Sequence, residues 1–200
     1  MVKKIGMVLG GLAVAAVAVV VLLKVYKDAQ DQKQMDAFAA RISTVSVRLV
    51  PAATLTEQPC EGKAASLRSV FFISRIALEQ VAKGGGTRLA MLMKAGGPPA
   101  SYRLDDKRWL GVVEVVQESQ PSSFGQRDFV GGQGRAWLSL FDLETGKAPC
   151  HAVVEYRNSP TVVVSATHTL TQDLRDQRDR AVAAAGAKLL GAPVEAQPVF

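Results

Sequence analysis

Several residue types that mark common protein classes are scarce in this chain of 200 residues. It has two cysteines and two histidines, and aromatic residues make up 6% of it. Two cysteines are too few for a disulfide-rich scaffold or a four-cysteine zinc module, although they allow one disulfide. The sequence also lacks the patterns GxGxxG, GxxxxGK[ST], HExxH and GxSxG. These absences favour a non-catalytic protein without cofactor or metal ion.

The composition excludes wholesale disorder. Apolar residues make up 48% of the chain and charged residues 21%, and the mean hydropathy is +0.12. Such a chain can bury a core, and its length suits one ordinary domain with an appendage.

The chain carries a net charge of +6, but the excess is concentrated near one end. Lys3 and Lys4 precede a long apolar run, and Lys24 and Lys27 follow it. Basic residues in these places are typical of segments that flank a membrane helix. Because no basic stripe interleaved with aromatic residues is left elsewhere, we expect no nucleic-acid partner.

The apolar run extends from Ile5 to Leu23 without a charged or strongly polar side chain. As a helix it would be about 28 Å long, close to the bilayer core of about 30 Å. A cleavable signal peptide is the alternative, but the small residues Ala16 and Ala18 lie inside the run, and cleavage there would leave apolar residues on the mature chain. The sequence therefore predicts an uncleaved anchor over 1–24, with the lipid bilayer as its partner.

The lysines of the short N-terminal head favour a cytoplasmic N-terminus and a periplasmic or extracellular domain. In that oxidising compartment Cys60 and Cys150 can form a disulfide, whereas in the cytosol they would be two unrelated thiols. Both cysteines follow a proline, in segments expected to be ordered near the surface. We predict the disulfide, and these two residues are the only site residues that the sequence predicts.

Residues 25–50 form a predicted juxtamembrane helix and connector. Met35, Phe38, Ile42 and Val45 recur at helical spacing, which favours packing on the protein's own domain; a short coiled coil is the alternative. Self-association also stays open, because Gly6 and Gly10 form a GxxxG pattern.

The sequence predicts an α+β domain over 51–190, followed by a flexible tail over 191–200. A helix over Ser66–Lys83 is expected to end at the triple glycine Gly84–Gly86, although the cluster Val70–Ile73 could be a strand. An antiparallel sheet of about four strands follows, over Trp109–Val116, Gly134–Phe141, Cys150–Tyr156 and Thr161–Ser165.

The end of the domain is predicted to be an amphipathic C-terminal helix. Thr169 and Gln172 have the spacing of a capping box, and apolar residues follow at helical spacing along one face. Such a helix packs on the sheet, which gives the α+β class.

The polar groups that could carry chemistry do not form a recognisable site. Cys150 and His151 are adjacent on a predicted strand, so their side chains point to opposite faces. Neither His151 nor His168 has a partner at metal-binding spacing. Asp105–Asp106 is typical of a solvated turn, and the region of Asp142 and Glu144 lacks the EF-hand pattern. The sequence thus predicts no catalytic, cofactor-binding or metal-binding residue.

The first 45 residues or so carry a resemblance to a known family. Lys3, Lys4, Ile5 and Gly6, followed by Met7, an apolar helix and its polar continuation, resemble the N-terminus of type IV pilins and pseudopilins. The family is processed after a glycine, which would be Gly6, and usually has a glutamate five residues into the mature chain, where this sequence has Gly11. The resemblance implies a filament subunit.

These observations lead to one hypothesis and two alternatives. We expect a single-pass membrane-anchored domain that is a non-catalytic binding or assembly component of the cell envelope, with a protein partner or self-association left open. The alternatives are a pilin-like filament subunit and an uncharacterised envelope enzyme, which polar side chains converging in a pocket would favour.

Overall fold

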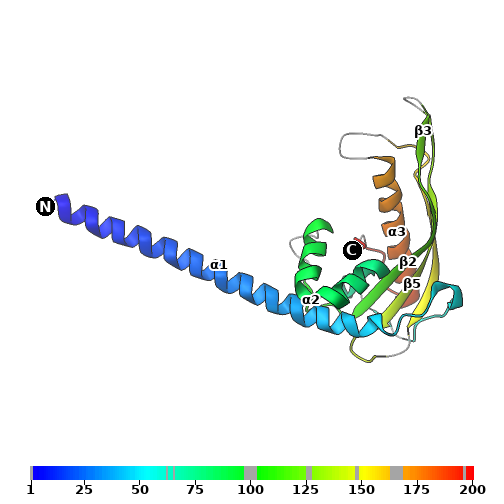
Figure 1. The fold of residues 1–200 in the computed structure, drawn as a ribbon, viewed down its shortest axis with the longest axis horizontal. Helices are drawn as coiled ribbons and strands as arrows, with labels where there is room; N and C mark the ends of the chain where they lie inside the picture. Colours follow the sequence, from blue (N-terminus) through cyan, green and yellow to red (C-terminus); the bar gives the residue numbers. More distant parts are fainter. Residues whose placement is uncertain are drawn as a thin grey trace.

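The computed structural model describes residues 2–61, 63–64, 66–96, 103–124, 128–146, 149–162, 169–195 and 197–200, with no side chains for 2–18, 96, 124 and 128. It contains three α-helices, two short 3-10 helices and six strands in the described part (Figure 1). Their bounds are α1 Val2–Ser46, η1 Ala52–Thr54, η2 Leu67–Ser69, β1 Val70–Ser74, α2 Arg75–Gly96, β2 Trp109–Ser119, β3 Ser122–Phe124, β4 Asp128–Val130, β5 Gln133–Asp142, β6 Cys150–Arg157 and α3 Leu170–Leu190.

The main sheet has four strands in the order β1-β2-β5-β6, which confirms an α+β fold. β2, β5 and β6 are antiparallel neighbours, but β1 pairs with β2 in parallel. The expectation of an entirely antiparallel sheet is therefore wrong. The reason is the connection, because α2 carries the chain from the end of β1 back to the start of β2, as parallel neighbours require.

The predicted strands agree with the structure unevenly. β2, β5 and β6 correspond to the first three predicted strands. β3 and β4, which lie between β2 and β5 in the sequence, form a separate hairpin. Most of the fourth predicted strand, Thr161–Ser165, lies outside the described residues. The fourth strand of the described sheet is β1, at the edge next to β2, so the strand interpretation of Val70–Ile73 is confirmed and the helix begins at Arg75 instead of Ser66.

The triple glycine does not end the helix as expected but bends it. α2 continues to Gly96, with Gly85 at φ 60° and ψ −151°, a conformation that side chains with a Cβ avoid. The next glycine lets α1 approach closely, because a Cβ on Gly86 would lie 2.1 Å from Oδ1 of Asp36. The glycines thus make a kink against which α1 packs.

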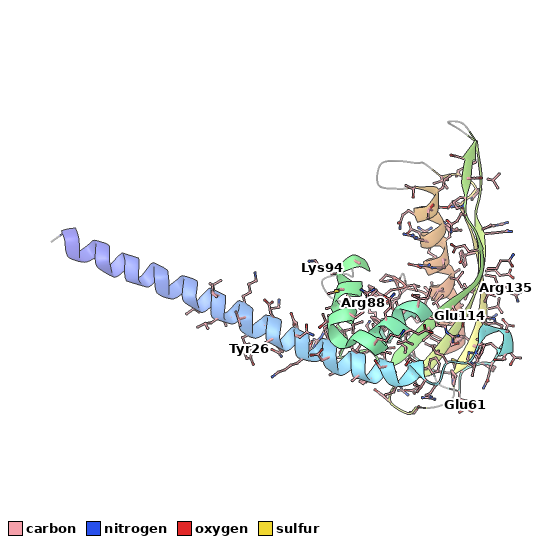
Figure 2. All side chains as sticks on the ribbon, viewed as in Figure 1. Tyr26, Glu61, Arg88, Lys94, Glu114 and Arg135 are labelled. Carbon is pink, nitrogen blue, oxygen red and sulfur yellow. A yellow bond between two sulfur atoms is a disulfide. The ribbon has the colours of Figure 1, made fainter. Side chains whose placement is uncertain are left out.

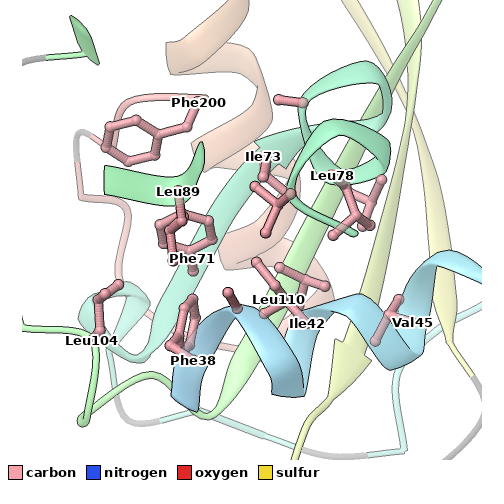
Figure 3. Close-up of a cluster of buried hydrophobic side chains, with 14 of the residues drawn as sticks. Phe38, Ile42, Val45, Phe71, Ile73, Leu78, Leu89, Leu104, Leu110 and Phe200 are labelled. Carbon is pink, nitrogen blue, oxygen red and sulfur yellow. The ribbon is translucent and has the colours of Figure 1, made fainter. Parts of the chain in front are cut away.

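The C-terminal part of α1 packs on the domain, as its apolar stripe predicts (Figure 3). Phe38, Ile42 and Val45 are at most 3% exposed. Phe38 meets the ring of Phe71 edge-on with centroids 5.1 Å apart. We call this cluster the α1–α2 core, and it comprises Phe38, Ala39, Ile42, Val45, Phe71, Ile73, Ala77, Leu78, Val81, Leu89, Met93, Leu104, Leu110, Val112, Phe141 and Phe200.

The N-terminal part of α1 extends away from the domain (Figures 1 and 2). Its first described side chains, from Val19 to Tyr26, include seven large apolar residues that are 53–70% exposed. In the described part of the chain, no helix has a stretch long and apolar enough to cross a membrane. The side chains of residues 5–18, most of the predicted anchor, lie outside that part.

α3 covers the other face of the sheet. Thr169 caps it by accepting a hydrogen bond from the amide of Gln172, but the Gln172 side chain bonds Asp176, so the expected box is half formed. The α3 core comprises Leu67, Val70, Phe72, Trp109, Val113, Ala136, Leu138, Leu140, Cys150, Val154, Tyr156, Leu174, Val182, Ala183, Ala187 and Leu190.

A buried polar network fixes the start of α3 to the end of β6. Asp173 accepts hydrogen bonds from the Asn158 amide and from both the backbone N–H and the hydroxyl of Ser159. Burial raises the pKa of Asp173, but these bonds outweigh that effect and lower it. Because each donor meets an acceptor, the network is structural.

The C-terminus differs from the expected flexible tail. Phe200 is 8% exposed and stacks on Phe71 with ring centroids 5.3 Å apart. Its backbone donates to Phe72 O at 3.1 Å and accepts from the amide of Ser74, so the chain end covers the free edge of β1.

Candidate functional site

The face of the sheet opposite α3 is covered over only part of its width. α1 and α2 pack on the apolar residues of β1 and β2, but the same face of β5 and β6 is mostly polar. We call this part the open half, and it consists of Arg135, Trp137, Ser139, His151, Val153 and Glu155. Figure 2 shows Arg135 pointing away from α3. It is the part of the sheet where polar side chains gather.

The segment of residues 47–61, which we call the strap, crosses one end of the open half. Gln58 forms an antiparallel bridge with His151 through two backbone hydrogen bonds of 3.0 Å each. The Glu57 carboxylate accepts a further bond from the amide of Val153 at 3.3 Å. The strap therefore lies along the edge of β6 like a short additional strand.

The predicted disulfide fastens the strap covalently. Cys60 and Cys150 are bonded, with their Cα atoms 4.9 Å apart. Cys150 is 3% exposed and belongs to the α3 core, whereas its neighbour His151 lies on the opposite face. Because the cysteine is oxidised and faces away from the histidine, the two cannot act as a thiol and a base.

A pocket of about 220 Å³ lies between the strap and the sheet. At its base the hydroxyl of Ser139 is hydrogen-bonded to Nδ1 of His151 at 2.8 Å, and both residues are buried. Burial lowers the pKa of His151, so the imidazole is neutral at pH 7. No described residue bonds the other ring nitrogen, Nε2. The pocket is lined by Arg48, Leu49, Val50, Gln58, Val112, Glu114, Ser139, Phe141, Pro149 and His151.

Arg75 holds the strap, α2 and β2 together beside this pocket. Its guanidinium donates to the Glu114 carboxylate at 2.7 Å, to the Glu79 carboxylate at 3.2 Å and to Val50 O at 3.2 Å. Arg48 lies on the other side of the pocket, with its guanidinium carbon 5.8 Å from the ring centroid of Phe141. Both arginines therefore position the strap over the pocket.

This arrangement combines apolar walls with five polar groups: the Ser139 hydroxyl, the neutral His151 imidazole, the Gln58 amide, the Glu114 carboxylate and the Arg48 guanidinium. It suits a small ligand that has an apolar body and a few hydrogen-bonding groups. A serine bonded to a histidine also has the first two parts of a nucleophile–base system. No group of His, Cys, Asp and Glu in the described residues can hold a metal ion.

The other polar groups noted in the sequence have structural environments. Asp105 pairs with Arg103 in an exposed turn. Burial raises the pKa of Asp142, but Arg108 at 2.8 Å and the amides of Glu144 and Thr145 outweigh it and lower the pKa to about 2. Asp142 thus caps the turn that follows β5. His168 lies outside the described residues.

Sequence reasoning missed the pairing of Ser139 with His151. The two residues are opposite each other only in the observed register of β5 and β6, and a shift of two residues would separate them. The one signal in the sequence was a polar residue in each of the two apolar strands, at a position where the side chain would point to the same face of the sheet.

No protein-family model matches this chain, and no curated protein sequence matches it. Among solved structures, the chain is similar to one described as a "putative lipoprotein" from Caulobacter crescentus CB15, with 15% identity over 62% of this chain and 86% of that chain. The TM-score of this match is 0.27, which is too low to indicate a shared fold.

Proposed function

We propose that the chain is a single-pass membrane protein whose N-terminal helix anchors an extracytoplasmic domain, and that this domain is a non-catalytic binding or assembly component of the cell envelope. The observation that carries the proposal is the exposed apolar surface of α1. Val19, Leu22 and Leu23 are 54%, 67% and 63% exposed on a helix that leaves the domain. Water is an unfavourable surrounding for such a surface, which continues the uncharged run from Ile5.

The disulfide supports the extracytoplasmic side of this proposal. Structural disulfides persist in oxidising compartments and are rare in the cytosol. Cys60–Cys150 joins two segments 90 residues apart and holds the strap over the pocket. In a compartment that keeps the two cysteines oxidised, the strap would stay in place and close one side of the pocket.

Anchoring is tested by deleting residues 1–24. The full chain should stay in membrane vesicles after a carbonate wash, and the truncated chain should be soluble and show the circular dichroism of a folded α+β domain. A truncated chain that unfolds or aggregates would mean that the apolar run belongs to the core. Leu55→Asp, in the strap, is a matched control that should leave the full chain in the vesicles.

Sidedness is tested by a reporter fused after Phe200. A reporter active only outside the cytoplasm should score positive, and one active only in the cytoplasm should be silent. The intact mass of the membrane form should include the N-terminal residues. A mass lacking Met1–Gly6 would instead indicate processing of the pilin type and a filament subunit.

A second candidate function is an envelope hydrolase, which the Ser139–His151 pair favours. In such an enzyme a neutral His151 would accept the proton of the Ser139 hydroxyl as the hydroxyl attacks an acyl group. A fluorophosphonate probe should then label wild-type protein at Ser139, with labelling lost in Ser139→Ala and strongly slowed in His151→Gln. Equal labelling of the wild type and Ser139→Ala would remove this candidate.

A further inference from the structure

β6 is an edge strand of the main sheet, and the strap covers only one end of it. His151 bonds Gln58 with both of its backbone groups, so alternate residues of β6 direct their N–H and C=O groups to the outer edge. These residues are His151, Val153, Glu155 and Arg157. The amide of Val153 is taken by Glu57, and among the described residues the last two have no partner on the edge.

Glu155 and Arg157 are exposed and lie on the same face of the sheet. Within the described residues, neither side chain forms a hydrogen bond or an ion pair, and neither backbone has a partner at the outer edge. Unpaired edge groups of this kind can bond another strand. The opposite charges of Glu155 and Arg157, two residues apart, also determine which partner strand can pair with this edge.

We propose that two copies of this chain pair through the free ends of their β6 strands. The strands would run antiparallel about a twofold axis at Tyr156, and they would extend the two four-stranded sheets into one. In this register Glu155 of each copy lies opposite Arg157 of the other. The outward backbone groups of these residues then form the alternating bonds of an antiparallel ladder.

Charge selects this register over its neighbours. Moving the axis to Glu155 would place two glutamates opposite each other, and moving it to Arg157 would do the same with two arginines. Like charges directly opposite are destabilising, whereas opposite charges stabilise the pair. Arg135 is the β5 neighbour of Glu155, so each row of side chains across the interface alternates in sign from Arg135 to Glu155 to the partner's Arg157.

The direction of α1 is compatible with this dimer. An antiparallel edge pair is related by an axis normal to the sheet, so both copies keep the same face on the same side. Figure 1 shows the upper sheet nearly edge-on, with α1 extending away from it. Both N-termini would therefore lie on one side of the joined sheet, as anchoring in one membrane requires.

The test uses full-length protein in detergent and measures the dissociation constant by sedimentation equilibrium over a range of concentrations. Wild type should self-associate reversibly. Glu155→Arg and Arg157→Glu each replace two attractive contacts by two repulsive ones, so each should raise the dissociation constant by about tenfold or more. Mixing the two variants should restore association, because one then presents only positive charges at these positions and the other only negative charges.

Lys188→Glu is the control, since it reverses an exposed charge on α3 away from this edge. It should leave the dissociation constant unchanged. A monomeric wild type would overturn the proposal, and so would a dimer that both reversals leave intact. If the reversals weaken association but their mixture does not restore it, the pairing register is wrong.

Discussion

The two faces of the main sheet differ in how completely they are covered. The α3 face is apolar on all four strands, from Phe72 on β1 to Val154 on β6, and α3 covers it. The opposite face is mostly apolar on β1, β2 and the end of β5, and it becomes mostly polar on the rest of β5 and on β6, with Arg135, Ser139 and His151. Within these strands, apolar side chains thus point to the face that a helix covers. The side chains on the opposite face of β5 and β6 are mostly polar, and this face carries the strap and the pocket.

Breaking the disulfide should have a large effect, because it holds the strap on the partly covered face. The double substitution Cys60→Ala/Cys150→Ala removes a link between segments 90 residues apart. We expect the free energy of unfolding to fall by about 4 kcal/mol in the chain-entropy account. Urea denaturation of the oxidised protein measures this fall. Reduced wild type should match the variant, and an unchanged midpoint would show that the strap stays in place without the bond.

Substitutions on opposite faces of β5 compare the two surfaces directly. Leu138 is fully buried in the α3 core, so Leu138→Ala should cost about 2–5 kcal/mol. Arg135 is exposed on the open half, and Arg135→Ala should change the free energy of unfolding by less than about 0.5 kcal/mol. Similar losses in chemical denaturation would mean that the open half is packed as tightly as the α3 face.

Asp142, a buried charge at the end of β5, should make stability depend on pH. The pKa of Asp142 is about 2 in the folded protein, whereas the unfolded chain has the ordinary value of 3.8. The unfolded chain therefore binds the proton more readily. The resulting stabilisation of about 2 kcal/mol is complete above pH 4 and is lost as the pH falls through 2. The difference in unfolding free energy between wild type and Asp142→Asn should therefore shrink over that range. A difference independent of pH would contradict the assignment.

Local patterns predicted much of this fold, whereas long-range pairing did not follow from them. The spacing of Phe38, Ile42 and Val45 predicted a packed helix, and Thr169 marked the start of α3. The cluster Val70–Ile73 fits a helix or a strand, and only pairing with β2 decides between them. The triple glycine predicted a break, but Gly85 makes a kink because α1 packs beside it.

The candidate site was the least predictable part because four segments that are distant in sequence build it. The cysteine count predicted Cys60–Cys150, since no other pairing exists within the chain. Ser139 and His151 belong to different strands, and their contact depends on the register of β5 with β6. The pocket above them also needs the strap, whose position follows from the disulfide and from the Gln58 bridge.

The smallest effect is expected from the titration of His151 under the strap. Burial lowers the pKa of its imidazole below 6.5, and the charged groups that line the pocket with it are Glu114 of β2 and Arg48 of the strap. Because the unfolded chain binds this proton more readily, the contribution is complete above pH 6.5 and is lost as the pH falls toward the folded pKa. Protonation would also make Nδ1 the donor in its hydrogen bond with the Ser139 hydroxyl. His151→Gln should flatten the pH dependence of stability between pH 7 and 5, and NMR titration of the ring should give a pKa below 6.5. A pKa at or above that value would contradict the inference that burial under the strap governs the titration of His151.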